Sequence, residues 1–485
     1  MVLAFIKRME PFFTLRNKLP LQIVQITLII TVISLSGAQL LLPNRPPGRS
    51  TTMGLGMRFR RWRSLKAYFI LNAIEVVFWA AVAFMMIRGN SSVCIGTSCA
   101  LGWVVFVLAG ILSPLAKYLA VVCYLDEVRQ SLELSIPSCE EWTEVNIHHS
   151  LLRIIGMVSG RVFIGPELCR SEQYLDAAIN YTMEVMGAQR AVQNMRPWLR
   201  PFLAQSQPEV KELYQRIAEA EAFLQPVVKS RIEAMADLSY EKPDDFLQWL
   251  IDGKDKFPDK DSQNLAKVQL GLTFVAVHTT ILTATNAFYD LAAMLDLQAE
   301  LRDEVREVLL QSGGVFTSNV LQGMKKMDSF LKETLRVHPT TMASFQRKVL
   351  KPFTLSNGQV IPAGLMIAAV AVNSDPFIFP RADEFDPLRF YRLRTQAKDE
   401  GSVEKAANNQ FVSVNQSSLT FGYGRHACPG RFFAANEIKM ILAHALLRYD
   451  VKLVGSETKR YPNMEFTHMS IPDPSRKLLF KAIGV

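Results

Sequence analysis

The sequence predicts a mainly α-helical body with a small β lobe, preceded by transmembrane helices. Three observations support this fold class. Long apolar runs lie within the first 125 residues, a 3.6-residue periodicity runs from Asp126 to about Val337, and strand and turn signals follow Arg336. A chain of 485 residues that is 49% hydrophobic and 20% charged can bury a large core, which excludes a disordered or fibrous protein.

Residues 1–125 are predicted to form a membrane-anchoring region, and residues 126–485 the folded body. The candidate spans are residues 21–42, 67–87 and 100–122. The anchoring region has 13 basic and 2 acidic residues (+11), whereas the remaining 360 residues have 41 basic and 43 acidic ones (−2). Basic residues beside apolar runs are typical of membrane flanks, so no nucleic-acid partner is expected.

The charge of the first long loop sets the expected orientation in the membrane. Residues 45–66 contain seven basic residues and no acid, which places this loop and the body from Asp126 onward in the cytosol. The connection between the second and third spans would then be luminal. There Asn90 is a candidate glycosylation site, and Cys94 and Cys99 could pair.

The stretch from Val268 to Tyr289 has no Asp, Glu, Lys or Arg, and could be taken for a fourth span. Eight of its 22 residues are nevertheless polar, a density that a lipid-facing helix would not tolerate. We therefore expect a central buried helix with a cavity on one side.

The β signals begin after this helical region. Two short apolar stretches joined by Asn357-Gly358 predict a hairpin over residues 353–361, and the run Leu365 to Val372 predicts a further strand. An irregular Pro-rich stretch follows from Pro376 to about Leu419, and a helix is expected from Gly430 to about Leu447.

The segment Phe421–Gly430, which opens that last helix, carries the strongest chemical signal. Its glycines allow close approach of the backbone to a flat ligand, and Cys428 precedes a helix start, where thiolate is favoured over thiol. His426 and Arg425 add positive donors. This pattern favours an axial thiolate ligand of a haem, and the alternative is a buried free cysteine in a turn.

This segment resembles the haem-binding signature of the cytochrome P450 haem-thiolate monooxygenases, of the type found in fungal secondary metabolism. The resemblance implies the cytochrome P450 fold and a haem b held by the Cys428 thiolate. It implies cofactor contacts from Phe421, Gly424, His426 and Gly430. Arg347 matches a position that often binds a haem propionate, and the alternative is an ordinary strand-edge arginine.

Other segments of the chain also match motifs of this family, in the order in which the family has them. Glu333-x-x-Arg336 and the Arg389 of Phe385–Phe390 resemble a buried Glu-Arg-Arg network that is structural. Val275–Thr280 resembles the oxygen-activating segment of the central helix. Thr279 matches its threonine, and His278 stands where an acid is usual. The alternatives are helix back-bonding for Thr279 and a hydrogen-bonded core histidine for His278.

No dinucleotide-binding or P-loop motif occurs, so the electrons must come from another protein. The resemblance implies an NADPH-cytochrome P450 reductase in the endoplasmic reticulum membrane that docks near Cys428. Arg431 and Lys439 are candidate docking charges, and the alternative for both is an ordinary solvated helix face. It also implies an apolar substrate, a terpenoid or related intermediate of secondary-metabolite biosynthesis.

The resemblance is expected to cover Glu140 to Val485. The region before Glu140 does not match, although members of the family normally have a β lobe and several helices between the membrane anchor and this point. Part of the N-terminal region of the fold is therefore expected to be lacking, with a skipped exon or mistaken gene model as the explanation. The alternative function is a degenerate, non-catalytic relative or an incorrect gene model that cannot hold haem. A haem-thiolate isomerase or dehydratase is a third reading.

Overall fold

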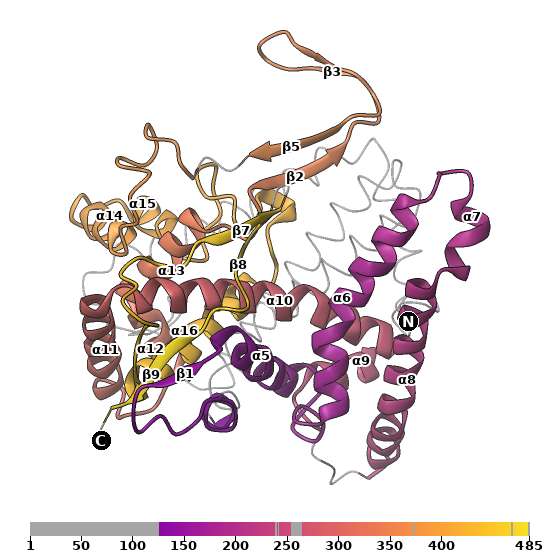
Figure 1. Cartoon of the computed structure of the whole chain (residues 1–485), viewed down its shortest axis with the longest axis horizontal. Coiled ribbons are helices and arrows are strands. Elements are labelled where there is room, and N and C mark those ends of the chain that lie inside the picture. Colours follow the sequence, from indigo (N-terminus) through magenta and orange to yellow (C-terminus); the bar gives the residue numbers. More distant parts are fainter. Residues whose placement is uncertain are drawn as a thin grey trace, which may run out of the picture. The chain divides into compact units, whose positions relative to one another are not determined.

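The computed structural model describes residues 126–237, 240, 242–253, 264–370, 373–466 and 469–483. Helices dominate this part of the chain (Figure 1). Their bounds are α5 (Ile147–Phe163), α6 (Glu172–Asn194), α7 (Arg200–Leu203), α8 (Pro208–Ala234), α9 (Phe246–Gly253), α10 (Leu265–Ala292), α11 (Leu295–Leu310), α12 (Ser318–Gly323), α13 (Lys325–Val337), α14 (Arg389–Asp399), α15 (Val403–Asn408) and α16 (Arg431–Arg448).

The strands form one three-stranded sheet and three two-stranded sheets among the described residues. The larger sheet has the order β1 (Thr143–Val145), β9 (Leu478–Ala482), β6 (Tyr449–Leu453), and all of its pairings are antiparallel. The two-stranded sheets are β2 (Ala343–Lys348) with β5 (Met366–Val370), β3 (Phe353–Thr354) with β4 (Val360–Ile361), and β7 (Asn463–Phe466) with β8 (Met469–Pro472). The mainly helical class with small sheets is therefore confirmed.

Helix α10 runs through the middle of the described body (Figure 1) and packs against α5, α6, α8, α13 and α16. Among the described residues it is the one helix long and apolar enough to cross a membrane, and half of its apolar stretch is buried by protein. Every residue from Thr283 to Ala292 is buried. The prediction of a central buried helix is confirmed, because neighbouring helices rather than lipid cover its apolar side chains.

The hairpin prediction is also confirmed. β3 pairs with β4 through Phe353–Ile361 and Thr354–Val360, and Gly358 adopts φ +84°, which suits glycine in a tight turn. The run after it forms β5. The helical region before Val337 contains one strand that the periodicity did not predict, β1, because its partner β9 lies more than 300 residues away.

A helical stretch over residues 126–135 precedes β1. Val128 and Leu132 are fully buried, and Glu127 accepts two hydrogen bonds from Arg170 at 2.8 and 2.7 Å. The folded body thus includes residues upstream of Glu140. The predicted spans, the glycosylation candidate Asn90 and the Cys94–Cys99 pair lie outside the described residues.

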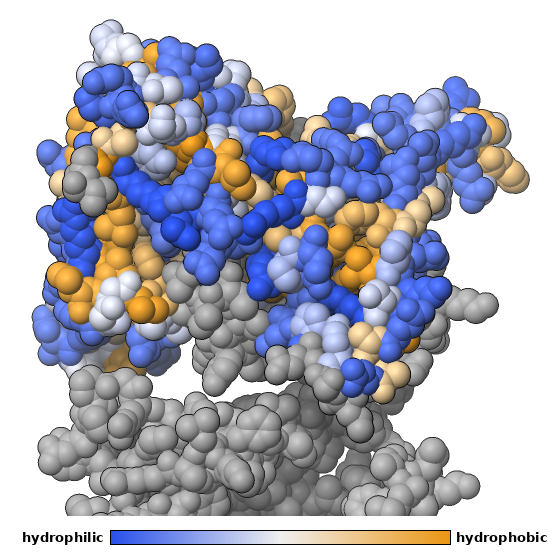
Figure 2. Space-filling view, turned by 90° about the horizontal axis from the view of Figure 1, so that it is seen from below, coloured by the Kyte–Doolittle hydropathy of each residue, from blue (hydrophilic) through white to orange (hydrophobic). Residues whose placement is uncertain are grey.

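The surface seen from below in Figure 1 is largely hydrophilic over the described residues, with smaller hydrophobic patches between (Figure 2).

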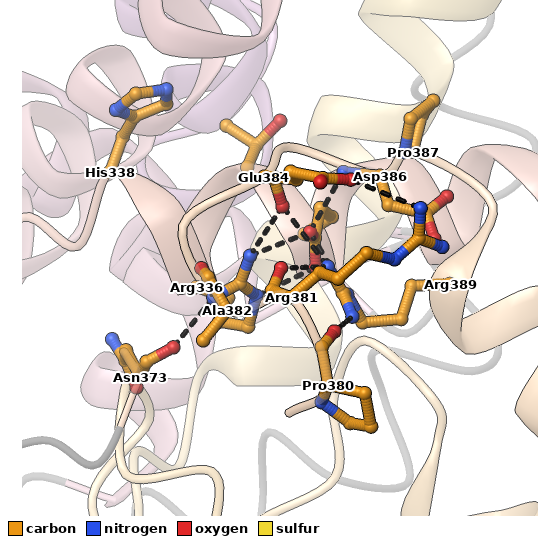
Figure 3. Close-up of polar contacts among 12 residues, drawn as sticks. Arg336, His338, Asn373, Pro380, Arg381, Ala382, Glu384, Asp386, Pro387 and Arg389 are labelled. Carbon is orange, nitrogen blue, oxygen red and sulfur yellow. Dashed lines mark hydrogen bonds and ion pairs between the residues drawn. The ribbon is translucent and has the colours of Figure 1, made fainter. Parts of the chain in front are cut away.

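A buried network is centred on Glu333 of α13 (Figure 3). The Arg336 guanidinium donates to both oxygens of Glu333 at 2.8 Å, and Arg389 donates to one of them at 3.1 Å. The three side chains are almost completely buried. Two cations thus share one carboxylate, and their remaining N–H groups need other acceptors.

Backbone carbonyls of the irregular stretch after β5 supply those acceptors. Arg336 donates to the carbonyls of Asn373, Ala382 and Glu384, and Arg389 donates to those of Pro380, Arg381 and Glu384. A segment without strand or helix has few partners of its own for its carbonyls. The two arginines therefore fix the path of residues 373–389, and Figure 3 shows this segment surrounding the guanidinium groups.

Two further buried carboxylates, Asp328 and Asp290, contact α13 or its neighbours in ways that the sequence did not indicate. Asp328 of α13 pairs with Lys439 of α16. Asp290 of α10 pairs with Arg460 and accepts a 2.8 Å hydrogen bond from Thr334 of α13. Helix α13 is thereby fixed to α10 on one side and to α16 on another.

A fourth buried carboxyl belongs to Glu437 on α16. Among the described residues its hydrogen-bond partner is Ser159 of α5, whose hydroxyl donates to it at 2.8 Å. Burial raises the pKa of Glu437 to about 8, an effect that the Ser159 hydrogen bond partly opposes. Glu437 is therefore mostly protonated in the folded protein at neutral pH.

Replacing Glu333 by Gln should lower the free energy of unfolding by about 3–5 kcal/mol, because it leaves two buried arginines without a counter-charge. Thermal unfolding of the detergent-solubilised chain measures this loss. Glu212→Gln, an exposed acid on α8, is the control and should change stability by less than about 0.5 kcal/mol. Equal melting curves for the two variants would contradict the role assigned to Glu333.

Glu437→Gln should change how stability depends on pH. The pKa of Glu437 rises from 4.5 in the unfolded chain to about 8 in the fold. Folding therefore favours the protonated form, and the stability this gives is complete below pH 4.5 and is lost as the pH rises toward 8. Between pH 5 and pH 8 the wild type should lose roughly 3 kcal/mol relative to the variant. If the difference in free energy of unfolding between the wild type and the variant were the same at pH 5 and pH 8, this prediction would be contradicted.

Candidate active site

The loop Phe421–Gly430 folds back on itself before α16. The Cys428 N–H donates to the Phe421 carbonyl at 2.7 Å, which closes the loop. Gly422 adopts φ +76°, and a Cβ there would come within 2.6 Å of the His426 carbonyl oxygen. The tight form of the loop therefore requires glycine at this position.

The Cys428 side chain lies at the start of α16, whose N-terminal residue is Arg431 and whose N-cap is Gly430. Burial raises the pKa of the Cys428 thiol, whereas hydrogen bonds from the backbone N–H groups of Gly430 and Arg431 and the charge of Arg431 lower it. These donors are aimed at the sulfur and would stabilise a thiolate. The residues present thus fit a thiolate-ligated haem.

Positive groups from separate elements meet beside this loop. Burial, Arg347 of β2 and Arg425 lower the pKa of His426, in that order of effect, and Arg425 Nε lies 3.1 Å from His426 Nε2. The structure thus brings Arg347 near His426, although 79 residues separate them. A group of basic side chains suits carboxylates such as haem propionates.

Phe421 and Gly424 determine the conformation of the loop Phe421–Gly430. Phe421 packs edge-on against Phe411, with ring centroids 5.4 Å apart, and lies against the main core. Gly424 adopts φ +60° and begins the 3₁₀ helix η7 (Gly424–His426). These contacts hold the loop in place without involving Cys428 itself.

Thr279 lies on an exposed face of α10, one turn after Val275, which is 58% exposed. Its hydroxyl donates to the Val275 carbonyl at 2.9 Å, and Thr280 donates in the same way to Ala276 at 2.8 Å. The back-bonding considered as the alternative is therefore present. It leaves the oxygen of Thr279 able to accept a hydrogen bond from outside the helix.

His278 points elsewhere. Its Nε2 lies 2.8 Å from the Ile179 carbonyl of α6, and burial lowers its pKa, which keeps the ring neutral at physiological pH. This contact is that of a hydrogen-bonded core histidine, the alternative to a proton relay.

Of the two candidate docking charges, Lys439 is engaged inside the protein, so the expectation is wrong for that residue, whereas Arg431 is partly exposed. Lys439 is buried and pairs with Asp328. Arg431 donates to the carbonyls of Val412 at 3.1 Å and Cys428 at 2.8 Å. Arg431 instead braces the loop that carries Cys428, a role that sequence reasoning missed because a helix-surface arginine gives no sign of its partner.

Comparisons with known proteins identify the family to which this chain is similar. The family model described as Cytochrome P450 matches residues 117–480. The match begins before Glu140, so the expected start of the resemblance was too late. It agrees with the packed helical stretch over residues 126–135.

Two fungal relatives and one solved structure illustrate the similarity. Cytochrome P450 monooxygenase ATR3 of Stachybotrys chlorohalonatus is 46% identical over 76% of this chain and 80% of that protein. Cytochrome P450 monooxygenase braC of Annulohypoxylon truncatum is 36% identical over 74% of this chain and 71% of that protein. Retinoic acid-bound cyanobacterial CYP120A1 has a TM-score of 0.59 at 19% identity, covering 77% of this chain and 78% of that one, which shows a shared fold.

Because the family model spans most of the chain and these fungal relatives share more than 30% identity over about three quarters of it, the chain belongs to the cytochrome P450 family and is a haem-thiolate monooxygenase.

Proposed function

We propose that this monooxygenase is bound to the endoplasmic reticulum membrane, faces the cytosol and oxidises an apolar small molecule, a terpenoid or related intermediate of secondary metabolism. Its electrons would come from an NADPH-cytochrome P450 reductase. The observation that carries the proposal is the loop around Cys428, which directs backbone donors toward a partly buried sulfur. The apolar runs before residue 125 support the membrane location.

The proposed cofactor is haem b with the Cys428 thiolate as its axial ligand. Arg347 and His426 would hold its propionates, while Phe421, Gly424 and Gly430 shape the loop beneath it. When bound, the haem supplies the activation of dioxygen and the insertion of one oxygen atom into the substrate.

Thr279 is proposed to hold and deliver a proton at the site where the haem would bind. Its hydroxyl is exposed on α10 and already donates to Val275, so its lone pairs can accept from a bound water. Val275 beside it supports the choice of an apolar substrate, because it presents an exposed branched side chain on the same face. The contact of His278 with Ile179 gives a proton-relay role for that residue no support.

A second candidate is a degenerate relative that cannot hold haem. The observation that favours it is the short connection between Asp126 and Glu140, where the resemblance leads us to expect a β lobe and several helices. The intact Cys428 loop favours the enzyme.

Membranes containing the full chain should give a strongly red-shifted Soret band in a reduced, carbon-monoxide difference spectrum, and Cys428→Ser should abolish it. A serine oxygen cannot replace the thiolate as an electron-rich axial ligand. Cys169→Ala, at a buried cysteine away from the loop, is the control and should keep the band. An unchanged spectrum for Cys428→Ser would refute the ligand assignment, and no haem signal from the wild type would favour the degenerate relative.

Thr279→Ala should lower the amount of product formed per dioxygen consumed several-fold, because protons would no longer be delivered in step with electrons. Thr279→Ser keeps a hydroxyl and should restore most of the coupling. Thr280→Ala removes a buried hydroxyl from the same helix and should leave the coupling near that of the wild type. Equal coupling in all four proteins would exclude the proton-delivery role.

A further inference from the structure

Arg431 is an unusual first residue for the helix that follows Cys428. The N-terminal end of a helix carries a partial positive charge, so acidic side chains are favoured in the first turn and cations are not. The first turn of α16 nevertheless contains no acid, and Arg431 is its first residue. A residue that departs from the local preference of a helix in this way indicates a contact outside that helix.

The Arg431 side chain folds back from α16 onto the loop that carries Cys428. Its Nη1 donates to the Cys428 carbonyl at 2.8 Å, and its Nε donates to the Val412 carbonyl at 3.1 Å. The guanidinium also lies over the ring of Phe432, 4.5 Å from the ring centroid. Because the guanidinium is a rigid planar group, its two directed bonds fix the two carbonyls relative to each other, which the flexible stem of a lysine would not do.

Val412 ends a short turn, residues 408–412, that helix α13 holds in place. Lys332 of α13 donates to two carbonyls of this turn, at 3.1 and 2.8 Å, and Asp328 of α13 accepts the Phe411 N–H at 2.9 Å. The Lys332 and Asp328 side chains are buried, so water competes little for these bonds. The turn is therefore a firm support for the Arg431 guanidinium.

The main chain of Cys428 is thereby held on both sides. Its N–H donates to the Phe421 carbonyl inside the loop, and its carbonyl accepts the bond from Arg431. A single rotatable bond, from Cα to Cβ, separates the sulfur from this main chain. The place of the sulfur relative to α13 therefore depends on the contacts that run through Arg431 and residues 408–412. Groups that orient a metal ligand in this way strongly affect how well it binds the metal.

We propose that Arg431 is a positioning residue for the proposed haem ligand, which ties the main chain of Cys428 to α13 and so keeps the sulfur in one place. The inference rests on the proposed function, because the place of this sulfur matters only if it ligates haem. It goes beyond that function by assigning the support of the ligand to a side chain outside the loop Phe421–Gly430.

Substitutions at two positions separate the placement of Cys428 from charge and from general stability. Arg431→Gln removes the charge and the paired bonds, whereas Arg431→Lys keeps the charge but has a single nitrogen for the two carbonyls. Phe432→Leu is milder, because it removes only the ring beneath the guanidinium at an exposed position, and Phe432→Tyr keeps that ring. Arg190→Gln removes an exposed arginine from α6 and is the matched control.

The measurement is the rate at which the red-shifted Soret band is lost at a temperature below the onset of unfolding. Membranes containing the full chain are reduced with dithionite under carbon monoxide, so a contact between Arg431 and a reductase cannot affect the result. Arg431→Gln should lose the band roughly tenfold faster than the wild type, and Arg431→Lys at least about threefold faster, because the ligand is no longer held in place.

The variants at Phe432 and the control should fall between these limits and the wild type. Phe432→Leu should lose the band about threefold faster, since the guanidinium loses its stacking partner. Phe432→Tyr and Arg190→Gln should stay within about twofold of the wild type. The melting temperature of the detergent-solubilised chain should change little in all five variants. A fall in melting temperature that parallels the loss of the band would show that Arg431 supports the whole body, and would overturn the positioning role.

The remaining outcomes separate this inference from the proposed function. A wild type without a red-shifted band overturns the proposed function. A wild-type band that Arg431→Gln and Phe432→Leu lose no faster than the control overturns the positioning role alone. Normal behaviour of Arg431→Lys beside rapid loss in Arg431→Gln would assign the effect to charge and also overturn it. If neither Arg431 variant folds, faster loss in Phe432→Leu than in Phe432→Tyr supports the role, and equal rates refute it.

Discussion

The carboxylate of Glu333, shared by Arg336 and Arg389, is the interaction on which the rest of the body depends. It joins α13 to a segment with no regular structure of its own, residues 373–389. Five residues earlier on the same helix, Asp328 pairs with Lys439 of α16, the helix that begins just after Cys428. Burying several charges is costly unless each is paired and hydrogen-bonded, and both groups meet that requirement. Helix α13 therefore serves as a common support for the irregular segment and for the helix behind the thiolate loop.

Much of the fold and the loop could be predicted from local patterns. Asn357-Gly358 placed the hairpin, the uncharged stretch after Val268 placed α10, and Phe421–Gly430 placed the start of α16. What could not be predicted depends on distant partners. A three-residue strand such as β1 cannot be predicted locally, because it forms only by pairing with the distant β9. The sequence also does not distinguish a helix lysine that faces solvent from one that, like Lys439, is paired with Asp328. The spacing of Glu333 and Arg336 indicated their contact, yet it carried no information about the carbonyls that complete it.

Neighbouring residues of the α10 motif face different surroundings because successive side chains on a helix point about 100° apart. His278 turns toward α6 and contacts Ile179, while Thr279 turns to the exposed face. Two and three turns further on, Asn286 and Asp290 are buried against Arg460. One helix thus carries a core face that holds the fold and an exposed face available for chemistry. The six-residue motif Val275–Thr280 contains residues of both faces, so a role assigned to one position does not extend to the next.

The same kind of contact recurs at several cations of this body. Arg336, Arg389, Arg431 and Lys332 all direct N–H groups at backbone carbonyls of irregular segments. Such cations order loops, and for that reason they are not available to a partner. On the side of the Cys428 loop that faces residues 408–418 the surface carries mainly amides and hydroxyls, whereas Arg347 and Arg425 gather beside His426. Recognition at such a surface relies on shape and on donors that are already oriented, because the cations beneath hold the loops that carry them.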